Sequence, residues 1–274
     1  MSVKHAAFAL VAALMLAGCG ARVPEIRDFP NDRSEAQNDA LVHAIIVSIH
    51  CELEDAVTDV INERDFNKRS AEAYDRFLKK WGAQVALTLR LDEQTSVSPS
   101  GLFGLPHAAF SLVGGASGTA DATRVDIINF QYKVSELYLG PDRKCERDTS
   151  APTDSLLIQS DLKLREWLDV MFLSVATGQI TRLSNKNVLS HQVTFDVTTS
   201  ADVTPAWKLA NGAINQRGLF LKVSRDRKHD LLVTFGPLDK TNSGNFLIPI
   251  AETTHELSQL TSGIATGFQN SVRP

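Results

Sequence analysis

The chain has few of the features that membrane-spanning, nucleic-acid-binding or disulfide-rich proteins need. Its 274 residues include 3 cysteines, 3 tryptophans and 3 tyrosines. Its longest apolar run, near the N-terminus, is shorter than the roughly 20 residues of a membrane-spanning helix. Lys and Arg number 28 against 32 Asp and Glu, which gives a formal net charge of −4. Without an excess of positive charge, we expect no nucleic-acid partner.

The motifs of several enzyme classes are also missing. No Gly-x-Ser-x-Gly or His-Glu-x-x-His occurs, so neither a serine hydrolase nor a zinc peptidase is indicated. Ser117 lies in the glycine-rich stretch 114–118, which lacks the Lys-Ser/Thr of a phosphate-binding loop and predicts a hairpin connection. The sequence therefore nominates no catalytic residue, no cofactor and no metal. A hydrolase with two carboxylates stays open, because spacing cannot select a pair among 32 acidic residues.

One set of metal-ligand residue types does fall on a predicted helix. His43, His50 and Glu54 are seven and four residues apart, so they share a helical face. The two histidines are about 10 Å apart along the helix axis, which is too far for one ion. We interpret these side chains as solvated or capping groups.

The N-terminus has the layout of a secretory signal peptide. Lys4 precedes the apolar run Ala6 to Leu16, and small residues follow. The sequence Leu16-Ala17-Gly18-Cys19 resembles the lipobox of bacterial membrane lipoproteins. This resemblance implies that residues 1–18 are a cleaved signal peptide and that Cys19 carries the lipid, a diacylglycerol with acyl chains such as palmitate. An ordinary signal peptide cut elsewhere, for example after Ala21, remains the alternative.

The same resemblance implies a place in the cell. Two or three acyl chains on Cys19 would hold the protein stably on a membrane, whereas one chain gives only marginal binding. We therefore expect a cell-envelope protein that faces the periplasm. Gly20, in place of the aspartate linked to inner-membrane retention in some bacteria, favours the outer membrane. The segment Ser160 to Leu168 resembles stretches of uncharacterised proteobacterial envelope proteins, which implies no activity.

With Cys19 assigned to the lipid, Cys51 and Cys145 remain as an even pair. In an oxidising compartment such a pair predicts a disulfide. The alternative is two separate thiols, with Cys51 buried and Cys145 exposed among charged residues.

The fold class that we expect is α+β. After a flexible tether at 19–37, Leu41, Ile45, Ile49 and Leu53 recur every four residues, which predicts a long helix. A second helix is expected at 70–81 and includes Trp81. Alternating apolar residues from Val85 to Leu91 and from Val125 to Val134 then predict antiparallel strands packed on the long helix. These strands could form one sheet or a sandwich of two.

The turn-rich stretch 140–154 separates the segments 38–145 and 146–274, which are either two domains or one continuous domain. In the second segment we expect a short strand at 156–158, a helix after Asp161, and a hairpin whose charged tip is Arg225 to Lys228. A helix at about 252–269 ends the chain, with Leu257, Leu260, Ile264 and Phe268 on one face. The function that fits is non-enzymatic binding of a protein or another envelope component; a periplasmic hydrolase of cell-wall or extracellular polymer is the alternative.

Overall fold

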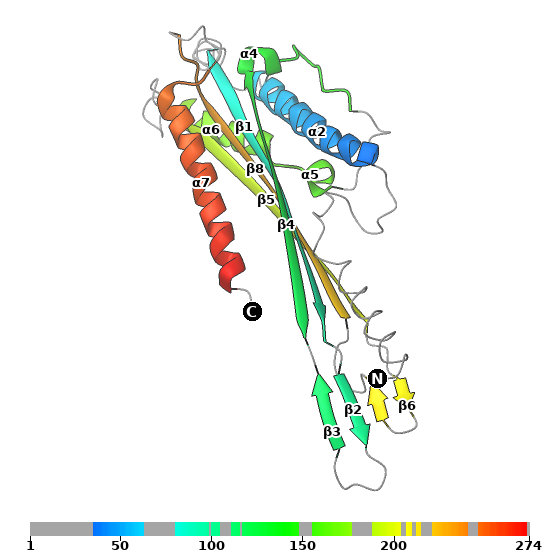
Figure 1. Ribbon diagram of the computed structural model, residues 1–274. Coiled ribbons are helices and arrows are strands. Elements are labelled where there is room, and N and C mark those ends of the chain that lie inside the picture. Colours follow the sequence, from blue (N-terminus) through cyan, green and yellow to red (C-terminus); the bar gives the residue numbers. More distant parts are fainter. Residues whose placement is uncertain are drawn as a thin grey trace. The chain divides into compact units, whose positions relative to one another are not determined.

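A computed structural model describes residues 35–62, 80–98, 100–104, 111–115, 117–147, 155–176, 188–203, 207–209, 212–214, 221–240 and 246–272 (Figure 1). The elements in chain order are α2 (Glu35–Asn62), β1 (Trp81–Val97), β2 (Ser100–Gly104), β3 (Ser111–Gly115), β4 (Gly118–Lys133), α4 (Val134–Leu137), α5 (Leu156–Gln159), α6 (Leu164–Ala176), β5 (Leu189–Val203), β6 (Trp207–Leu209), β7 (Gly212–Ile214), β8 (Leu221–Pro237) and α7 (Pro249–Val272). This content confirms the α+β prediction, including the long N-terminal helix and the C-terminal helix. Cys19, most of the tether and most of the helix expected at 70–81 lie outside the described residues.

The described residues divide into two compact units. Unit 1 comprises those between 89 and 126 and between 196 and 228, and unit 2 comprises the others. Each unit is therefore built from separate stretches of the sequence. The four long strands form an antiparallel sheet in the order β4-β1-β8-β5, and each of them contributes residues to both units.

In unit 2 the two central strands are buried on both faces. Residues 81–83 and 85–87 of β1 are buried, and so are all of 231–237 in β8. Successive strand residues point to opposite faces of a sheet, so this continuous burial requires cover on both sides. Helices provide that cover (Figure 1).

On one face lies a layer of helices that includes α2 and α6. The four-residue repeat of α2, from Leu41 to Leu53, is buried as its spacing predicts. The ring of Trp167 on α6 lies 6.0 Å from that of Phe235 on β8, and 5.0 Å from that of His191 on β5. The odd-numbered residues of β5 and β8 thus face α6.

On the opposite face lies α7. Even-numbered β8 residues face it, because Thr234 is hydrogen-bonded to His255 of α7 and Asp230 accepts a hydrogen bond from Ser262. At the start of the helix the chain passes close to the sheet at Gly236. A Cβ atom at this glycine would lie 2.8 Å from the Cβ of Ala251. The absence of a side chain at 236 is what allows α7 to approach the strand this closely.

Unit 1 contains a second, smaller sheet in the order β3-β2-β7-β6. Its strands pair antiparallel, with Leu102 opposite both Val113 and Ala213. The faces of the long sheet in unit 2 are covered by helices, so a sandwich of two sheets does not describe unit 2.

The prediction of a hairpin with its tip at Arg225 to Lys228 is wrong. These residues lie inside the uninterrupted strand β8. Arg225 and Arg227 continue the face of Leu221 and Val223, and Arg225 is buried with its Nε 3.2 Å from a carboxylate oxygen of Glu93. Burial also lowers the pKa of Arg227. Arg225 is thus paired within unit 1 rather than solvated at a turn.

Two shorter predictions also fail. Residues 156–158 belong to the helical turn α5 instead of a strand, and its N-terminus is capped by Ser155, whose Oγ accepts the backbone N–H of Leu157 at 3.3 Å. An apolar triplet fits either element, so the cap decides the conformation here. Trp81 opens strand β1, so the helix expected before it does not extend to this residue.

Candidate functional site

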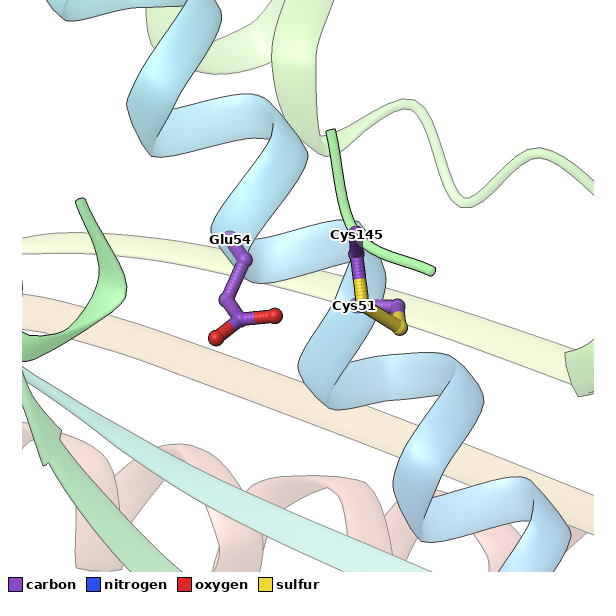
Figure 2. Close-up of side chains that lie close together, drawn as sticks. All are labelled: Cys51, Glu54 and Cys145. Atoms are coloured by element: carbon purple, nitrogen blue, oxygen red, sulfur yellow. A yellow bond between two sulfur atoms is a disulfide. The ribbon is translucent and has the colours of Figure 1, made fainter. Parts of the chain in front are cut away.

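Cys51 and Cys145 are joined by a disulfide (Figure 2). Cys51 is buried near the middle of α2, and Cys145 lies in the irregular segment that follows α4. Their Cα atoms are 5.2 Å apart, and 94 positions separate them in the sequence. The bond therefore ties a segment with no strand or long helix of its own to the longest helix of the protein.

Polar side chains of α2 hold the same segment, residues 138–147. Asp55 accepts the backbone N–H of Cys145 at 2.8 Å, and Thr58 Oγ1 accepts that of Leu139 at 3.0 Å. Asn62 donates to the carbonyl of Gly140 at 3.2 Å and accepts the hydroxyl of Tyr138 at 3.1 Å. Backbone groups that regular structure would pair are thus satisfied by side chains at one-turn intervals along α2.

Surface ion pairs surround these contacts. Lys144 Nζ is 2.5 Å and Arg165 Nε is 3.4 Å from Asp59 Oδ2, and Arg147 is 3.5 Å from Asp55. The three cations are all more than half exposed. Such pairs contribute roughly 0–1 kcal/mol each, so the hydrogen bonds and the disulfide matter more for this segment.

Glu52 connects α2 to the start of α6. Its Oε1 accepts the backbone N–H of Leu162 at 2.7 Å. Burial raises the pKa of the Glu52 carboxyl to about 7, although the hydrogen bond from Leu162 acts in the opposite direction. A carboxyl with this pKa could serve as a general acid or base, but its observed role is to bind a main-chain group.

Glu54 brings a carboxylate close to the disulfide. One carboxylate oxygen and the two sulfur atoms of Cys51 and Cys145 all lie within 4.8 Å of one another, and Figure 2 shows the three side chains. The sulfurs are bonded to each other, so neither is the thiolate that binds a metal ion. In this state the cluster offers only the Glu54 oxygens.

Of the two histidines considered with Glu54, His50 lies beside it and His43 does not. His50 Nε2 lies 3.7 Å from Glu54 Oε1, and its ring contacts that of Tyr132 with centroids 4.7 Å apart. His43 is exposed two helical turns away. Ser117 is exposed between β3 and β4. These two strands belong to different sheets, so they do not form the hairpin that the sequence predicts.

A row of hydrogen-bonded polar side chains runs from β5 through β8 to α7, and the sequence alone did not indicate it. The His255 ring nitrogen Nδ1 is 2.8 Å from Thr234 Oγ1, which is 3.1 Å from Ser190 Oγ. His255 is 1% exposed, and burial lowers its pKa to about 4. The imidazole is therefore neutral at pH 7, and it helps to fix α7 on the sheet.

Asp230 of β8 is a second polar anchor for α7. Its carboxylate accepts hydrogen bonds from Gln192 at 2.9 and 3.0 Å, from Thr194 at 2.9 Å and from Ser262 at 2.6 Å. With Asp55, Asp59 and Glu52, it belongs to a group of carboxylates whose partners lie within the protein.

The outward side of α7 is apolar. Four large side chains there are exposed, and we call them the α7 stripe: Ile250 (48%), Leu257 (57%), Leu260 (60%) and Ile264 (55%). The side toward the sheet instead carries Ala251 and His255, which are buried. One face of the helix therefore packs on the sheet, and the opposite face directs four large apolar side chains to solvent.

Strand β4 lies beside α7 and also exposes a large apolar side chain. Asn129 accepts a hydrogen bond from Gln259 of α7 at 3.1 Å, so the odd-numbered face of β4 lies next to the helix. Ile127, two positions away on that face, is 59% exposed.

None of the helices in the described part of the chain is both long and apolar enough to cross a bilayer.

Comparisons with known proteins give no family for the chain. No protein-family model matches it, and no curated protein matches it. A structure of the secretin InvG from the Salmonella SPI-1 type III secretion injectisome matches 70% of this chain and 74% of InvG, with 8% identity and a TM-score of 0.21. A structure of the basal-body proteins InvG, PrgH and PrgK matches 70% of this chain and 52% of the other, with the same identity and score. Scores this low do not indicate a shared fold.

Proposed function

We propose that this chain is a lipid-anchored protein of the bacterial cell envelope that acts by binding another protein, without catalysis. Acyl chains on Cys19 would hold it on the membrane, facing the periplasm. The α7 stripe would be the binding surface. The observation that carries the proposal is the stripe itself, because soluble proteins rarely expose several large apolar side chains along one helix face unless a partner covers them.

The proposed anchor rests on the lipobox-like sequence that ends at Cys19. It would supply the attraction to a membrane that the net charge of the chain does not provide. With a formal net charge of −4, the protein has no general attraction to anionic lipid. Covalent lipid would therefore be the means of attachment. A protein attached in this way is confined to the membrane surface, where a partner in the same membrane is at high effective concentration.

The polar groups of the described residues support binding over hydrolysis. A hydrolase that uses two carboxyls needs both of them in a cleft, directed at substrate. Asp55, Asp230 and Glu52 instead bind groups of their own chain. No observation favours the hydrolase alternative, so we retain the binding function alone.

The anchor can be tested by growing cells with radiolabelled palmitate and comparing the wild-type chain with Cys19→Ser. We expect label in the wild type and none in the variant. Equal labelling of the two proteins would rule out Cys19 as the lipid site, and labelling of neither would rule out lipidation.

The binding surface can be tested in intact cells with a photoreactive amino acid at position 257 or 260. A residue at position 135, which is exposed on α4, is the matched control. We expect adducts heavier than the monomer from 257 and 260 but not from 135. If illumination gives only the monomer at both stripe positions, the stripe is not a binding surface.

A further inference from the structure

We propose that the partner of the α7 stripe is the same stripe on a second copy of this chain, with the two α7 helices side by side, parallel and in register. This inference rests on the proposed function, since the parallel direction follows from a shared membrane anchor. It goes beyond that function by naming the occupant of the surface.

The spacing of the stripe points to another helix. Ile250, Leu257, Leu260 and Ile264 are separated by seven, three and four residues. This is the a and d pattern of a heptad repeat, in which apolar side chains of one helix fit between those of another with the same spacing. Isoleucine at a positions with leucine at d favours two-stranded pairing. Ile250, Leu257 and Ile264 are at a positions and Leu260 is at a d position, whereas the d position before it is Thr253.

The way α7 already packs leaves this seam free. Ala251 and His255, which contact the sheet, are at the b and f positions on the far side of the helix from the seam. A second helix can therefore join the stripe while α7 stays on the sheet.

The residues that flank the seam are compatible with close contact. The hydroxyls of Thr254 and Thr261 donate to the carbonyls of Ile250 and Leu257 of their own helix, at 2.7 and 2.8 Å. These polar groups keep a hydrogen-bond partner when water is removed, so their burial carries little penalty. At Gly263 a Cβ atom would meet nothing within 4 Å, which leaves space for the neighbouring helix.

A parallel pair of copies brings no like charges together. Among the flanking positions 254, 256, 261 and 263, only Glu256 is charged. In a parallel pair the g position faces an e position, so Glu256 of one copy lies opposite Thr261 of the other. Two copies anchored on one membrane and related by a two-fold axis along its normal also present their helices in the same direction. The anchor raises their effective concentration, which a seam of four side chains needs.

The test uses single cysteines in the full-length protein, in intact envelopes treated with a short bis-maleimide. Leu257→Cys and Leu260→Cys are the stripe variants, and Ser135→Cys is the exposed control. A parallel in-register pair brings each stripe cysteine next to its own counterpart. We therefore expect a dimer that survives reduction in each stripe variant, at a level at least tenfold above that of Ser135→Cys.

A second substitution checks that the stripe causes the linkage. Ile264→Glu in the Leu257→Cys protein should reduce the dimer at least tenfold, whereas Ile264→Leu should retain it. The fold of the Ile264→Glu protein is verified by a cooperative urea-unfolding transition that matches that of the Ile264→Leu protein.

The outcomes separate this inference from the proposed function. Adducts with a protein of a different mass, or dimers that require two different stripe positions, would overturn the parallel second copy and leave the binding function standing. Monomer alone would overturn the second copy. The photoreactive residues at 257 and 260, which need no cysteine on the partner, then decide whether the binding function stands. Equal linkage at 135 and at the stripe would indicate random collision and would overturn the inference as well. Palmitate labelling of Cys19 is independent of all these results.

Discussion

Asp55 on α2 accepts the backbone N–H of Cys145 at 2.8 Å, about one helical turn from Cys51, to which Cys145 is bonded. The covalent bond and the hydrogen bond thus fix the same point of the 138–147 segment. They act on different states of the chain. The disulfide restricts the unfolded chain, whereas the Asp55 contact stabilises only the folded one.

This difference can be measured by unfolding the purified mature protein in urea. Replacing Cys51 and Cys145 together by serine should lower the free energy of unfolding by about 2–4 kcal/mol, because a loop of this length is costly to order. Asp55→Ala, with the disulfide intact, should cost about 1–2 kcal/mol through the unpaired N–H of Cys145. A larger loss from Asp55→Ala than from the double serine variant would contradict this assignment.

Glu52 should make the protein less stable at neutral pH and above than in mild acid. Its pKa is about 7 in the folded protein, above its ordinary value of 4.5. The stabilisation from this group is therefore fully present below pH 4.5 and is lost as the pH rises through 7. Glu52→Gln keeps an acceptor for Leu162 without a charge, so at pH 8 it should be more stable than the wild type by on the order of 2 kcal/mol.

The comparison is made by urea unfolding at pH 5 and at pH 8. At pH 5 the difference should be well under half of that at pH 8, because the pH has passed only the lower of the two pKa values. A gain of the same size at both values would show that the effect is not due to ionisation of Glu52.

Elements with strong periodicity could be predicted from the sequence. The four-residue repeat from Leu41 to Leu53 places α2, and the alternation from Val85 to Leu91 places part of β1. Strand β8 could not be predicted in full, because four consecutive charged or titratable residues look like a turn. The partner that neutralises Arg225 is Glu93, which comes from a different strand. Local pattern gives no information about such a partner.

The last helix shows a different limit. The spacing of Leu257, Leu260 and Ile264 predicts a helix with an apolar face, and α7 is present. Large apolar residues would normally mark the buried side, yet here the smaller Ala251 and the polar His255 contact the sheet. The close approach at Gly236 and the hydrogen bond to Thr234 select that side, and both depend on residues of β8.

The candidate site was predictable to a similar extent. The pairing of Cys51 with Cys145 follows from counting cysteines once Cys19 is assigned to lipid. The hydrogen bonds from Asp55, Thr58 and Asn62 to the 138–147 segment leave no such signal, because polar residues on a helix are usually solvated.

His255 should make the protein less stable in acid. Its pKa is about 4 when folded, below its ordinary value of 6.5, so its contribution is present above pH 6.5 and is lost as the pH falls through 4. Across this range the loss should be on the order of 3 kcal/mol. In His255→Asn, which cannot titrate, we expect this part of the pH dependence to disappear, although stability at pH 7 is lower because packing and the Thr234 contact are altered.

The exposed His43 provides the control for this experiment. Unfolding free energies of the wild type, His255→Asn and His43→Asn are compared between pH 4 and 7. The slope for His43→Asn should follow that of the wild type. An unchanged slope in His255→Asn would show that His255 does not resist protonation in the folded protein.

Two glycines near α7 should respond to alanine in opposite directions. In Gly236→Ala the new Cβ would lie 2.8 Å from the Cβ of Ala251, so the helix must shift, and we expect a loss of about 1–3 kcal/mol. In Gly263→Ala the new methyl meets nothing within 4 Å and alanine favours the helix, so stability should rise by up to about 1 kcal/mol. Thermal unfolding at low protein concentration would measure both. A stabilising Gly236→Ala would mean that α7 does not approach β8 this closely, since only that approach makes the two glycines differ.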